Sequence, residues 1–302
     1  MGLPHLDVTV CFPKGIVMRD QASRVAAKAA VFVVAADARP AGRCVIRPGK
    51  KSGHGVEVCR PNTKNAKATC LNCNWQKICL PTGLGSEDLK RMDEVVTVRR
   101  KLMRYETLFH TGDDFTGLYA IRSGFFKTST CLENGREQVT GFQMPGEILG
   151  LDGIFDAHHT CNAVALQDAE VCSLSLDRIA EFFPLVTGLQ HHVHKIMSRE
   201  IVREQDVMLM LGSMRSEERV TAFLLNLVRR LHAHGFSRTE VILQMTREEI
   251  GSYLGMKIET VSRIFTRLME QGMVAVNQRH IHILDPVALR QSVGQFEGLR
   301  AR

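Results

Sequence analysis

Hydrophobic residues between positions 186 and 211 recur in alternating steps of three and four residues, which is the spacing of a coiled-coil seam. The pattern predicts one long helix that associates with a second copy of itself. Its seam consists of His194, Met197, Ile201, Glu204, Met208 and Leu211. The alternative, a helix that packs only on its own domain, stays open at this point.

Glu204 is the acidic member of this seam. In a dimer, two Glu204 carboxylates would meet in a partly dry interface, where like charges raise the free energy of association. The seam is therefore expected to be marginally stable. Three histidines near the start of the helix, His191, His192 and His194, are interpreted as solvated or seam residues.

A different pattern precedes the long helix, from about residue 98 to residue 178. Short strand-prone pieces are separated there by glycines, which predicts an antiparallel roll or barrel. The strand candidates are residues 118–121, 125–128, 138–142 and two pieces within 164–176. Before the roll we expect a short amphipathic helix that begins at Ser86 and has Leu89, Met92 and Val96 on one face.

Helical patterns resume after Gly212 and Ser213, which are expected to break the long helix. Ser216 is a candidate cap for the next helix, which ends at Gly235.

Residues 246–284 have the pattern of a winged helix-turn-helix. Thr246 to Glu249 form a capping box of the S/T-x-x-E type, which opens a short helix that ends at Gly255. A second helix is expected over residues 258–271, so that two short helices flank a glycine turn. Two strand-prone pieces, 273–276 and 280–284, predict a hairpin wing.

Composition adds fewer constraints. A chain of 302 residues suits two domains plus a tail, and its net charge of +7 favours a polyanionic partner. No hydrophobic run reaches the length of a transmembrane helix. Residues 1–65 are expected to be a poorly ordered extension. Their apolar run at 26–36 is interrupted by Lys28 and lies too far from Met1 for a signal peptide.

Three of the nine cysteines form a C-x2-C-x5-C pattern at Cys70, Cys73 and Cys79. Thiols this close can bind one metal centre, and an odd total favours metal or redox chemistry in a reducing compartment over a disulfide scaffold. A usual zinc site would require a second close pair of ligands, C-x2-C or H-x3-H, and none follows in the sequence. Spacing leaves three candidates for a fourth ligand: Cys131, Cys161 and Cys172.

The second helix of the helix-turn-helix leaves Glu259, Ser262 and Arg263 facing outward near its N-terminus, where such a helix meets base edges in the major groove. Arginine suits guanine, glutamate can accept from cytosine, and serine is adaptable. An ordinary solvated face is the alternative, but the capping box, glycine turn and wing favour DNA. Basic residues that flank this face and could hold phosphates are Arg247, Lys257, Arg267 and Arg279.

The chain resembles the FNR (fumarate and nitrate reduction regulator) branch of the cyclic-AMP receptor protein family over roughly residues 66–290. The similar segments occur in consistent order and are CLNCNWQKICLP, YAIRSG, EQVTGF, GEILGLDGI, SREIVREQD and GMKIETVSRIFTRL. The resemblance implies an α+β fold with an N-terminal β-roll (double-stranded β-helix, cupin-like) sensor domain, a long dimerisation helix and a C-terminal winged helix-turn-helix. The expected divisions are an extension at 1–65, the cysteine loop and sensor at 66–185, the dimerisation helix at 186–212 and the DNA-binding domain at 213–302.

The resemblance also implies the roles of individual residues. An oxygen-labile [4Fe-4S] cluster would be bound by Cys70, Cys73, Cys79 and, in the β-roll, Cys172. Dimerisation would use Met197, Ile201, Glu204 and Met208, with the Glu204 charge disfavouring dimers once the cluster is lost. Glu259, Ser262 and Arg263 would recognise an inverted repeat of the TTGAT…ATCAA kind. The region of residues 128–137 would contact RNA polymerase.

One departure concerns nucleotide binding. Cyclic-nucleotide binders of the wider superfamily place an Arg-Ser pair where this chain has residues 158–161, and a glutamate where it has Leu151. Because this segment offers no arginine for a bidentate phosphate contact, no cyclic nucleotide is expected.

These features predict a cytoplasmic, homodimeric, oxygen-responsive transcription regulator that binds double-stranded DNA, controls genes of anaerobic metabolism and is not an enzyme. One alternative is a nitric oxide or general redox sensor that uses the same cysteines. Others are a constitutive DNA binder with a structural zinc site and an iron–sulfur or zinc enzyme. The enzyme is disfavoured because no Ser/His/Asp or paired-carboxylate arrangement stands beside the cysteines.

Overall fold

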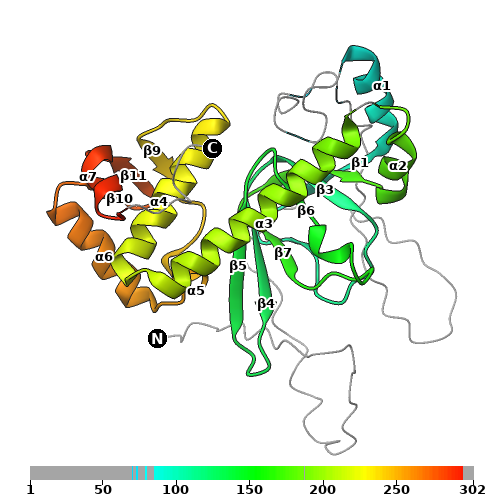
Figure 1. The fold of residues 1–302 in the computed structure, drawn as a ribbon. Helices are drawn as coiled ribbons and strands as arrows, with labels where there is room; N and C mark the ends of the chain where they lie inside the picture. Colours follow the sequence, from blue (N-terminus) through cyan, green and yellow to red (C-terminus); the bar gives the residue numbers. More distant parts are fainter. Residues whose placement is uncertain (1–69, 71–72, 74–78, 80–84, 187, 295–302) are drawn as a thin grey trace, which may run out of the picture. The chain divides into compact units, whose positions relative to one another are not determined.

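The computed structural model describes residues 70, 73, 79, 85–186 and 188–294 (Figure 1). The extension predicted for residues 1–65 lies outside these. The described part contains two four-stranded antiparallel sheets, a long helix and a helical domain with a three-stranded sheet. The predicted α+β fold, with a β-roll, a long helix and a winged helix-turn-helix, is confirmed. None of the described helices is long and apolar enough to cross a membrane.

The β-roll consists of two sheets that face each other across an apolar core. The first has the order β1 (Val96–Leu102), β8 (Ala169–Leu174), β3 (Leu118–Ser123), β6 (Ile148–Leu149). The second has the order β2 (Thr107–Phe109), β7 (Asn162–Ala165), β4 (Phe126–Cys131), β5 (Glu137–Gln143). Buried Leu102, Ile121 and Phe126 come from both sheets and belong to one cluster. Alternating strand positions thus supply the roll with its core.

Gly124 illustrates why glycines separate the strands. It lies in the turn between β3 and β4 with φ +89°, and a Cβ at this position would lie 2.4 Å from the Cβ of Ala169. Both the left-handed backbone and the close approach require glycine here.

Helices cover the first sheet. They are α1 (Ser86–Val95), α2 (Leu176–Phe182) and the start of α3 (Leu189–Ser213), while the short η1 (Leu151–Gly153) follows β6. Met92, Ile179 and Leu189 are fully buried in the cluster that joins these helices to the sheet. Val96, predicted to lie on the first helix, instead begins β1, because it pairs with Leu174 of β8.

The long helix differs from its prediction at both ends. It starts at Leu189 rather than near 186, and it continues through Gly212 and Ser213 instead of breaking there. The Met214 N–H still donates to the carbonyl of Met210, so helical hydrogen bonding persists across the glycine.

The C-terminal domain contains elements that the sequence pattern did not predict. Its elements are α4 (Ser216–Ala233), β9 (Glu240–Ile242), α5 (Arg247–Leu254), α6 (Ile258–Glu270), β10 (Val274–Asn277), β11 (His280–Ile283) and α7 (Pro286–Gln291). β9 and α7 were missed, and β9 makes the wing sheet three-stranded. Ser216 is the first residue of α4 rather than its cap. Arg215 occupies the cap, and its N–H donates to Glu218 Oε2 at 2.7 Å.

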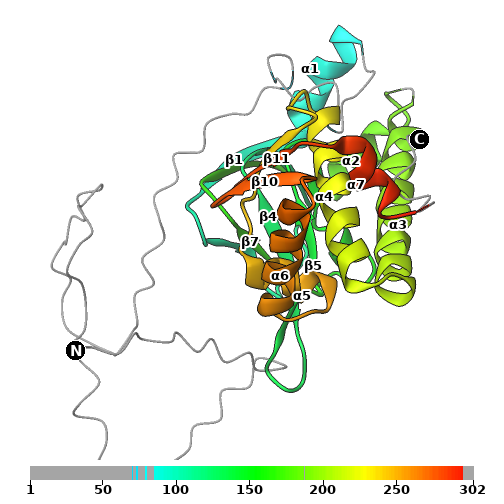
Figure 2. The ribbon, with the colours of Figure 1, turned by 90° about the vertical axis from the view of Figure 1, so that its left-hand side faces the viewer.

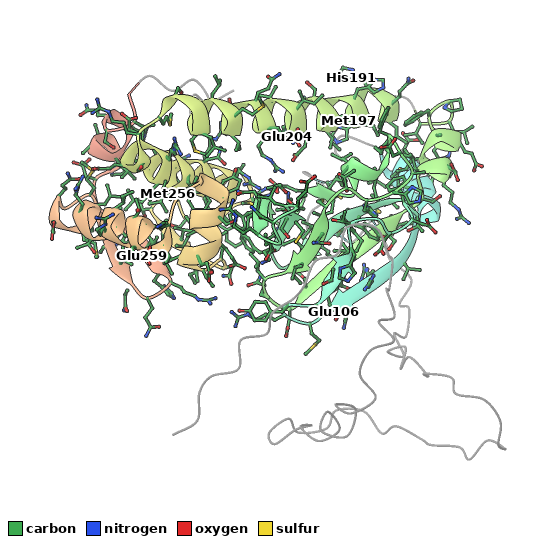
Figure 3. The ribbon with its side chains drawn as sticks, turned by 90° about the horizontal axis from the view of Figure 1, so that it is seen from below. Glu106, His191, Met197, Glu204, Met256 and Glu259 are labelled. Atoms are coloured by element: carbon green, nitrogen blue, oxygen red, sulfur yellow. The ribbon has the colours of Figure 1, made fainter. Side chains whose placement is uncertain are left out.

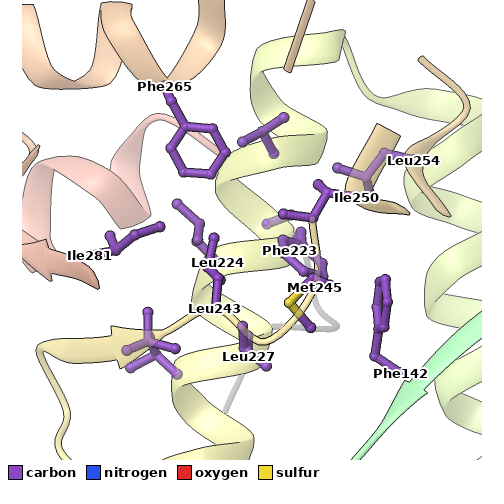
Figure 4. Packing of buried hydrophobic residues seen from close by; sticks show 14 of the residues in the cluster. Phe142, Phe223, Leu224, Leu227, Leu243, Met245, Ile250, Leu254, Phe265 and Ile281 are labelled. Atoms are coloured by element: carbon purple, nitrogen blue, oxygen red, sulfur yellow. The ribbon is translucent and has the colours of Figure 1, made fainter. Parts of the chain in front are cut away.

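The core of this domain continues into the β-roll. Phe142 of β5 packs edge-to-face on Phe223 of α4, with ring centroids 6.0 Å apart (Figure 4). It packs in the same way on Tyr253 of α5, with ring centroids 5.3 Å apart. α5 lies beside β5 (Figure 1, Figure 2). The first helix of the helix-turn-helix is therefore packed directly against a strand of the roll.

Candidate functional site

Four cysteines from two distant segments gather over the first sheet. Cys70 is buried, and Cys79 and Cys172 pack against the same apolar cluster. Cys172 lies on β8, where it pairs with Arg99 of β1 and Ala120 of β3. The Cys73 N–H donates to the Cys70 carbonyl at 3.2 Å.

Electrostatic interactions connect these thiols with one another. Burial raises the pKa of Cys70, and Asp93, Cys79 and Cys172 raise it further. Burial also raises the pKa of Cys172, with Cys73 adding to the shift and Arg99 opposing it. The Cys70 and Cys172 thiols, whose pKa values are raised, are therefore expected to stay protonated at neutral pH, and binding of a metal centre would release their protons.

The donor set fits an iron–sulfur cluster in kind, since such clusters are held by cysteine thiolates. No group of three or more His, Cys, Asp or Glu side chains in the described part of the chain is arranged to hold a metal ion directly. The fit therefore rests on four thiols brought together from the loop and from β8, and not on ligand geometry.

Two residues near the thiols were not assigned to this site from the sequence. The Asp93 carboxylate on α1 accepts from both the backbone N–H and the thiol of Cys70. His192 of α3, interpreted above as solvated or in the seam, is half-buried and forms a hydrogen bond with the backbone of Cys79. Burial lowers the pKa of His192 while this hydrogen bond opposes the shift. Sequence spacing carried no signal for either contact, because each crosses between separate elements.

The three predicted base-reading residues lie together on α6. Glu259, Ser262 and Arg263 are exposed, while Val261, Ile264 and Phe265 face the core. Figure 3 shows Glu259 near the start of this helix. The capping box is present, with Thr246 N–H donating to Glu249 at 2.8 Å. Gly255 has φ +65° and ends α5 in the left-handed conformation.

The flanking basic residues differ in their freedom to meet phosphates. The Arg247 guanidinium stacks on Phe265, 3.4 Å from the ring centroid, and burial lowers its pKa to about 10. Arg267 pairs with Glu217 at 2.7 Å, and Arg279 donates to the Gln244 carbonyl at 3.4 Å. Lys257 is exposed at the N-cap of α6. Lys257 is thus best placed for a phosphate contact, whereas Arg247 packs against the recognition helix.

The predicted dimer seam is largely uncovered in the single chain. Ile201 and Met208 are 55% and 72% exposed, Glu204 is exposed, and Met197 is half-buried. Figure 3 shows Met197 and Glu204 along α3. Exposed apolar residues at coiled-coil spacing form a face suited to a second helix.

The hairpin between β4 and β5 contacts the helix-turn-helix within the same chain. Lys127 bridges Glu137 and Glu249 at 3.1 and 3.2 Å. Residues 132–136 at the tip are exposed. Of the region predicted to meet RNA polymerase, the tip is therefore accessible, while Glu137 also faces α5.

An open cavity of about 430 Å³ lies between the roll and α3. Its lining includes Leu151 and Cys161, from the segments where cyclic-nucleotide binders place their ligand residues, together with Glu204 of α3. His159 does not extend into solvent: it is buried and stacked on Phe109 with ring centroids 3.6 Å apart. Cys161 donates to Asp152 at 3.5 Å and stays apart from the four thiols.

The roll, the long helix and the winged helix-turn-helix together define a transcription regulator of the cyclic-AMP receptor type. Two family models match the chain: a cyclic nucleotide-binding domain over residues 99–184 and a Crp-like helix-turn-helix domain over residues 218–292. The structure of FixK2 from Bradyrhizobium japonicum is similar, with a TM-score of 0.59 and 26% identity, covering 64% of this chain and 95% of FixK2.

Relatives that match this chain over most of their own length identify the branch of the family. The chain is 42% identical to the transcriptional regulatory protein btr of Bordetella pertussis, covering 76% of this chain and 94% of btr. It is 40% identical to the transcriptional activator protein anr of Pseudomonas aeruginosa, covering 77% and 96%. It is 38% identical to the fumarate and nitrate reduction regulatory protein of Escherichia coli, covering 74% and 90%. The chain belongs to the FNR branch of the cyclic-AMP receptor protein family. Because these relatives are transcription regulators, the prediction that the chain is not an enzyme is confirmed.

Proposed function

We propose that this regulator senses oxygen through a [4Fe-4S] cluster held by Cys70, Cys73, Cys79 and Cys172. The observation that carries the proposal is the gathering of these thiols from the N-terminal loop and from β8. When bound, such a cluster would supply oxygen-labile redox chemistry. Its four thiolates would tie the loop to the roll, next to the start of α3, where His192 contacts Cys79.

Dimer formation along α3 is the proposed output of this site. Met197, Ile201 and Met208 would bury apolar surface against a second copy, and the paired Glu204 carboxylates would oppose that association. Cluster binding must therefore stabilise the dimer more than the monomer, which makes the switch a population shift.

The dimer would present two α6 helices to successive faces of the major groove, about one helical turn apart. Glu259, Ser262 and Arg263 would recognise the two halves of a TTGAT…ATCAA-like repeat in genes of anaerobic metabolism. The exposed tip at residues 132–136 supports a contact with RNA polymerase. The regulator would act in the cytoplasm as a homodimer without a cyclic nucleotide.

The test is an anaerobic purification followed by absorption spectroscopy, iron and acid-labile sulfide assays, and DNA binding before and after exposure to air. We expect a coloured protein whose cluster and specific DNA binding are both lost in air. A colourless, zinc-loaded protein that binds DNA equally in air would refute the proposal and establish the zinc alternative. Loss of binding with nitric oxide but not with air would favour the nitric oxide sensor.

A further inference from the structure

Glu147 connects three elements that belong to different parts of the regulator. It lies in the turn between β5 and β6, where its Oε2 accepts from the Met144 N–H at 3.0 Å. Arg230 of α4 donates to the same carboxylate through Nε and Nη2, at 2.6 to 3.0 Å. Arg203 of α3 approaches Oε2 at 3.4 Å. We call Glu147, Arg203 and Arg230 the ionic hub.

The ionic hub is secluded from solvent. The three side chains are only 16 to 20% exposed. Arg230 Nη2 also donates to the Phe142 carbonyl at 2.6 Å, which fixes the guanidinium against β5. Partly buried ion pairs of this kind demand a defined geometry, since each charge depends on its partner for compensation.

The ionic hub lies next to residues of the predicted dimer seam on α3. Arg203 also forms a hydrogen-bonded ion pair with Glu200, which lies about one helical turn earlier on α3. Burial raises the pKa of Glu200, Arg203 opposes that shift, and the charge of Glu204 adds to it. Arg203 and Glu204 are consecutive, so they point about 100° apart around the helix. A rotation of α3 that changes how Glu204 meets a partner must also move Arg203.

Two polar contacts between the roll and α5 do not involve α3. The Val139 N–H donates to Ser252 Oγ at 2.9 Å, and Lys127 pairs with Glu249. These contacts hold α5 against β5, but they do not depend directly on the position of α3. The ionic hub joins α3, the roll and α4 through a single carboxylate.

We propose that the ionic hub is the relay by which the state of α3 sets the position of the DNA-binding domain. Arg203 and Arg230 are thus positioning residues for DNA recognition. This proposal rests on the proposed function, because the change in α3 that the hub would transmit comes from the cluster. The effect of the hub on DNA affinity is separate from cluster binding and from dimerisation.

The test uses the full chain with Arg203→Met combined with Glu200→Gln. Arg203→Met alone would leave Glu200 without its partner and could unfold the chain. The double variant replaces an ion pair by a neutral pair of similar shape, which proteins often tolerate. Arg199→Met is the matched control, because Arg199 is an exposed cation on the same helix outside the hub.

Iron content, dimer fraction by light scattering, and affinity for a TTGAT…ATCAA duplex are measured without oxygen. We expect the double variant to keep its iron and its dimers but to bind the duplex at least about tenfold more weakly, while Arg199→Met stays within about twofold of wild type. Equal or tighter binding by the double variant at the same dimer fraction would overturn the relay. Failure of the double variant to dimerise would also overturn it, in favour of a purely structural role.

The two proposals fail in different ways. If the wild type holds no cluster, or binds DNA equally in air, the oxygen sensor is wrong. The comparison of variants at equal dimer fraction still decides whether the hub sets DNA affinity.

Discussion

Buried Cys70 lies in the apolar cluster against which Cys172 packs, although Cys70 belongs to the N-terminal cysteine triplet and Cys172 to a central strand of the roll. Cys172 owes its place to strand register, since β8 pairs with β1 on one side and β3 on the other. A metal centre at this point would join a loop to a sheet, next to helices α1 and α3.

Cys172→Ser is expected to abolish stable cluster binding, because three thiolates leave the site incomplete. Cys161→Ser is the matched control, since Cys161 is a half-buried cysteine of the same roll that contacts Asp152 instead. Iron and acid-labile sulfide per chain, measured without oxygen, should fall to near background only in the first variant. Equal iron in both variants would exclude Cys172 as a ligand.

Glu204→Ala should preserve dimers and specific DNA binding in air, because it removes the carboxylate repulsion from the seam. Gln205→Ala, at the neighbouring exposed position, should remain oxygen-sensitive like wild type. Sedimentation and gel-shift measurements in air separate the two. A monomeric, inactive Glu204→Ala protein in air would show that the charge does not control dimerisation.

Arg263→Ala should weaken binding to the inverted repeat by about 1–3 kcal/mol and relax the preference for the base pair that it contacts. Lys257→Ala should instead weaken binding to all sequences similarly and reduce the salt dependence by about one phosphate contact. Titrations of matched and substituted duplexes at several salt concentrations distinguish base reading from phosphate contact. The assignment fails if Arg263→Ala retains full sequence preference.

Glu147 should make folding stability depend on acid pH. Burial by itself would raise its pKa, but Arg230 and Arg203 lower it to about 2 from an ordinary value of 4.5. A depressed carboxyl pKa contributes stability that is complete above the ordinary value and is lost as the pH falls toward 2. The contribution is on the order of 1–3 kcal/mol.

Urea unfolding of wild type and Glu147→Gln at pH 6 and pH 3 measures this effect. The stability advantage of wild type should shrink at the lower pH. Glu133→Gln, in the exposed tip of the β4–β5 hairpin, should show no such convergence. An advantage that does not change with pH would mean that the ionic hub is not charged as described.

Gly251→Ala should destabilise the DNA-binding domain by about 1–3 kcal/mol, as overpacking does. A Cβ at Gly251 would lie 2.6 Å from the Met256 carbonyl, in the turn that leads to α6. Gly212→Ala meets nothing within 4 Å and should be neutral or slightly stabilising. Thermal unfolding and DNA titration of both variants check this. Equal stability would show that the α5–α6 turn can relax.

Local sequence signals predicted the helix-turn-helix well. The Thr246–Glu249 capping box and the Gly255 turn act within a few residues, so their pattern in the chain is the pattern in space. β9 was missed because three residues cannot show a strand period, and it exists through its pairing with β11. Val96 was assigned to the first helix because its strand conformation depends on pairing with Leu174, which the local sequence pattern does not show.

By itself the sequence determined the spacing of the cysteine triplet, the apolar spacing of the predicted seam on α3 and the outward face of α6, because each is a pattern within one segment. The choice among Cys131, Cys161 and Cys172 could not come from spacing, although family resemblance favoured Cys172. Only the tertiary structure brought Asp93 to Cys70 and His192 to Cys79, and only it joined Glu147 to Arg203 and Arg230. These contacts cross between separate elements, so they depend on strand register and helix packing, which no local periodicity encodes.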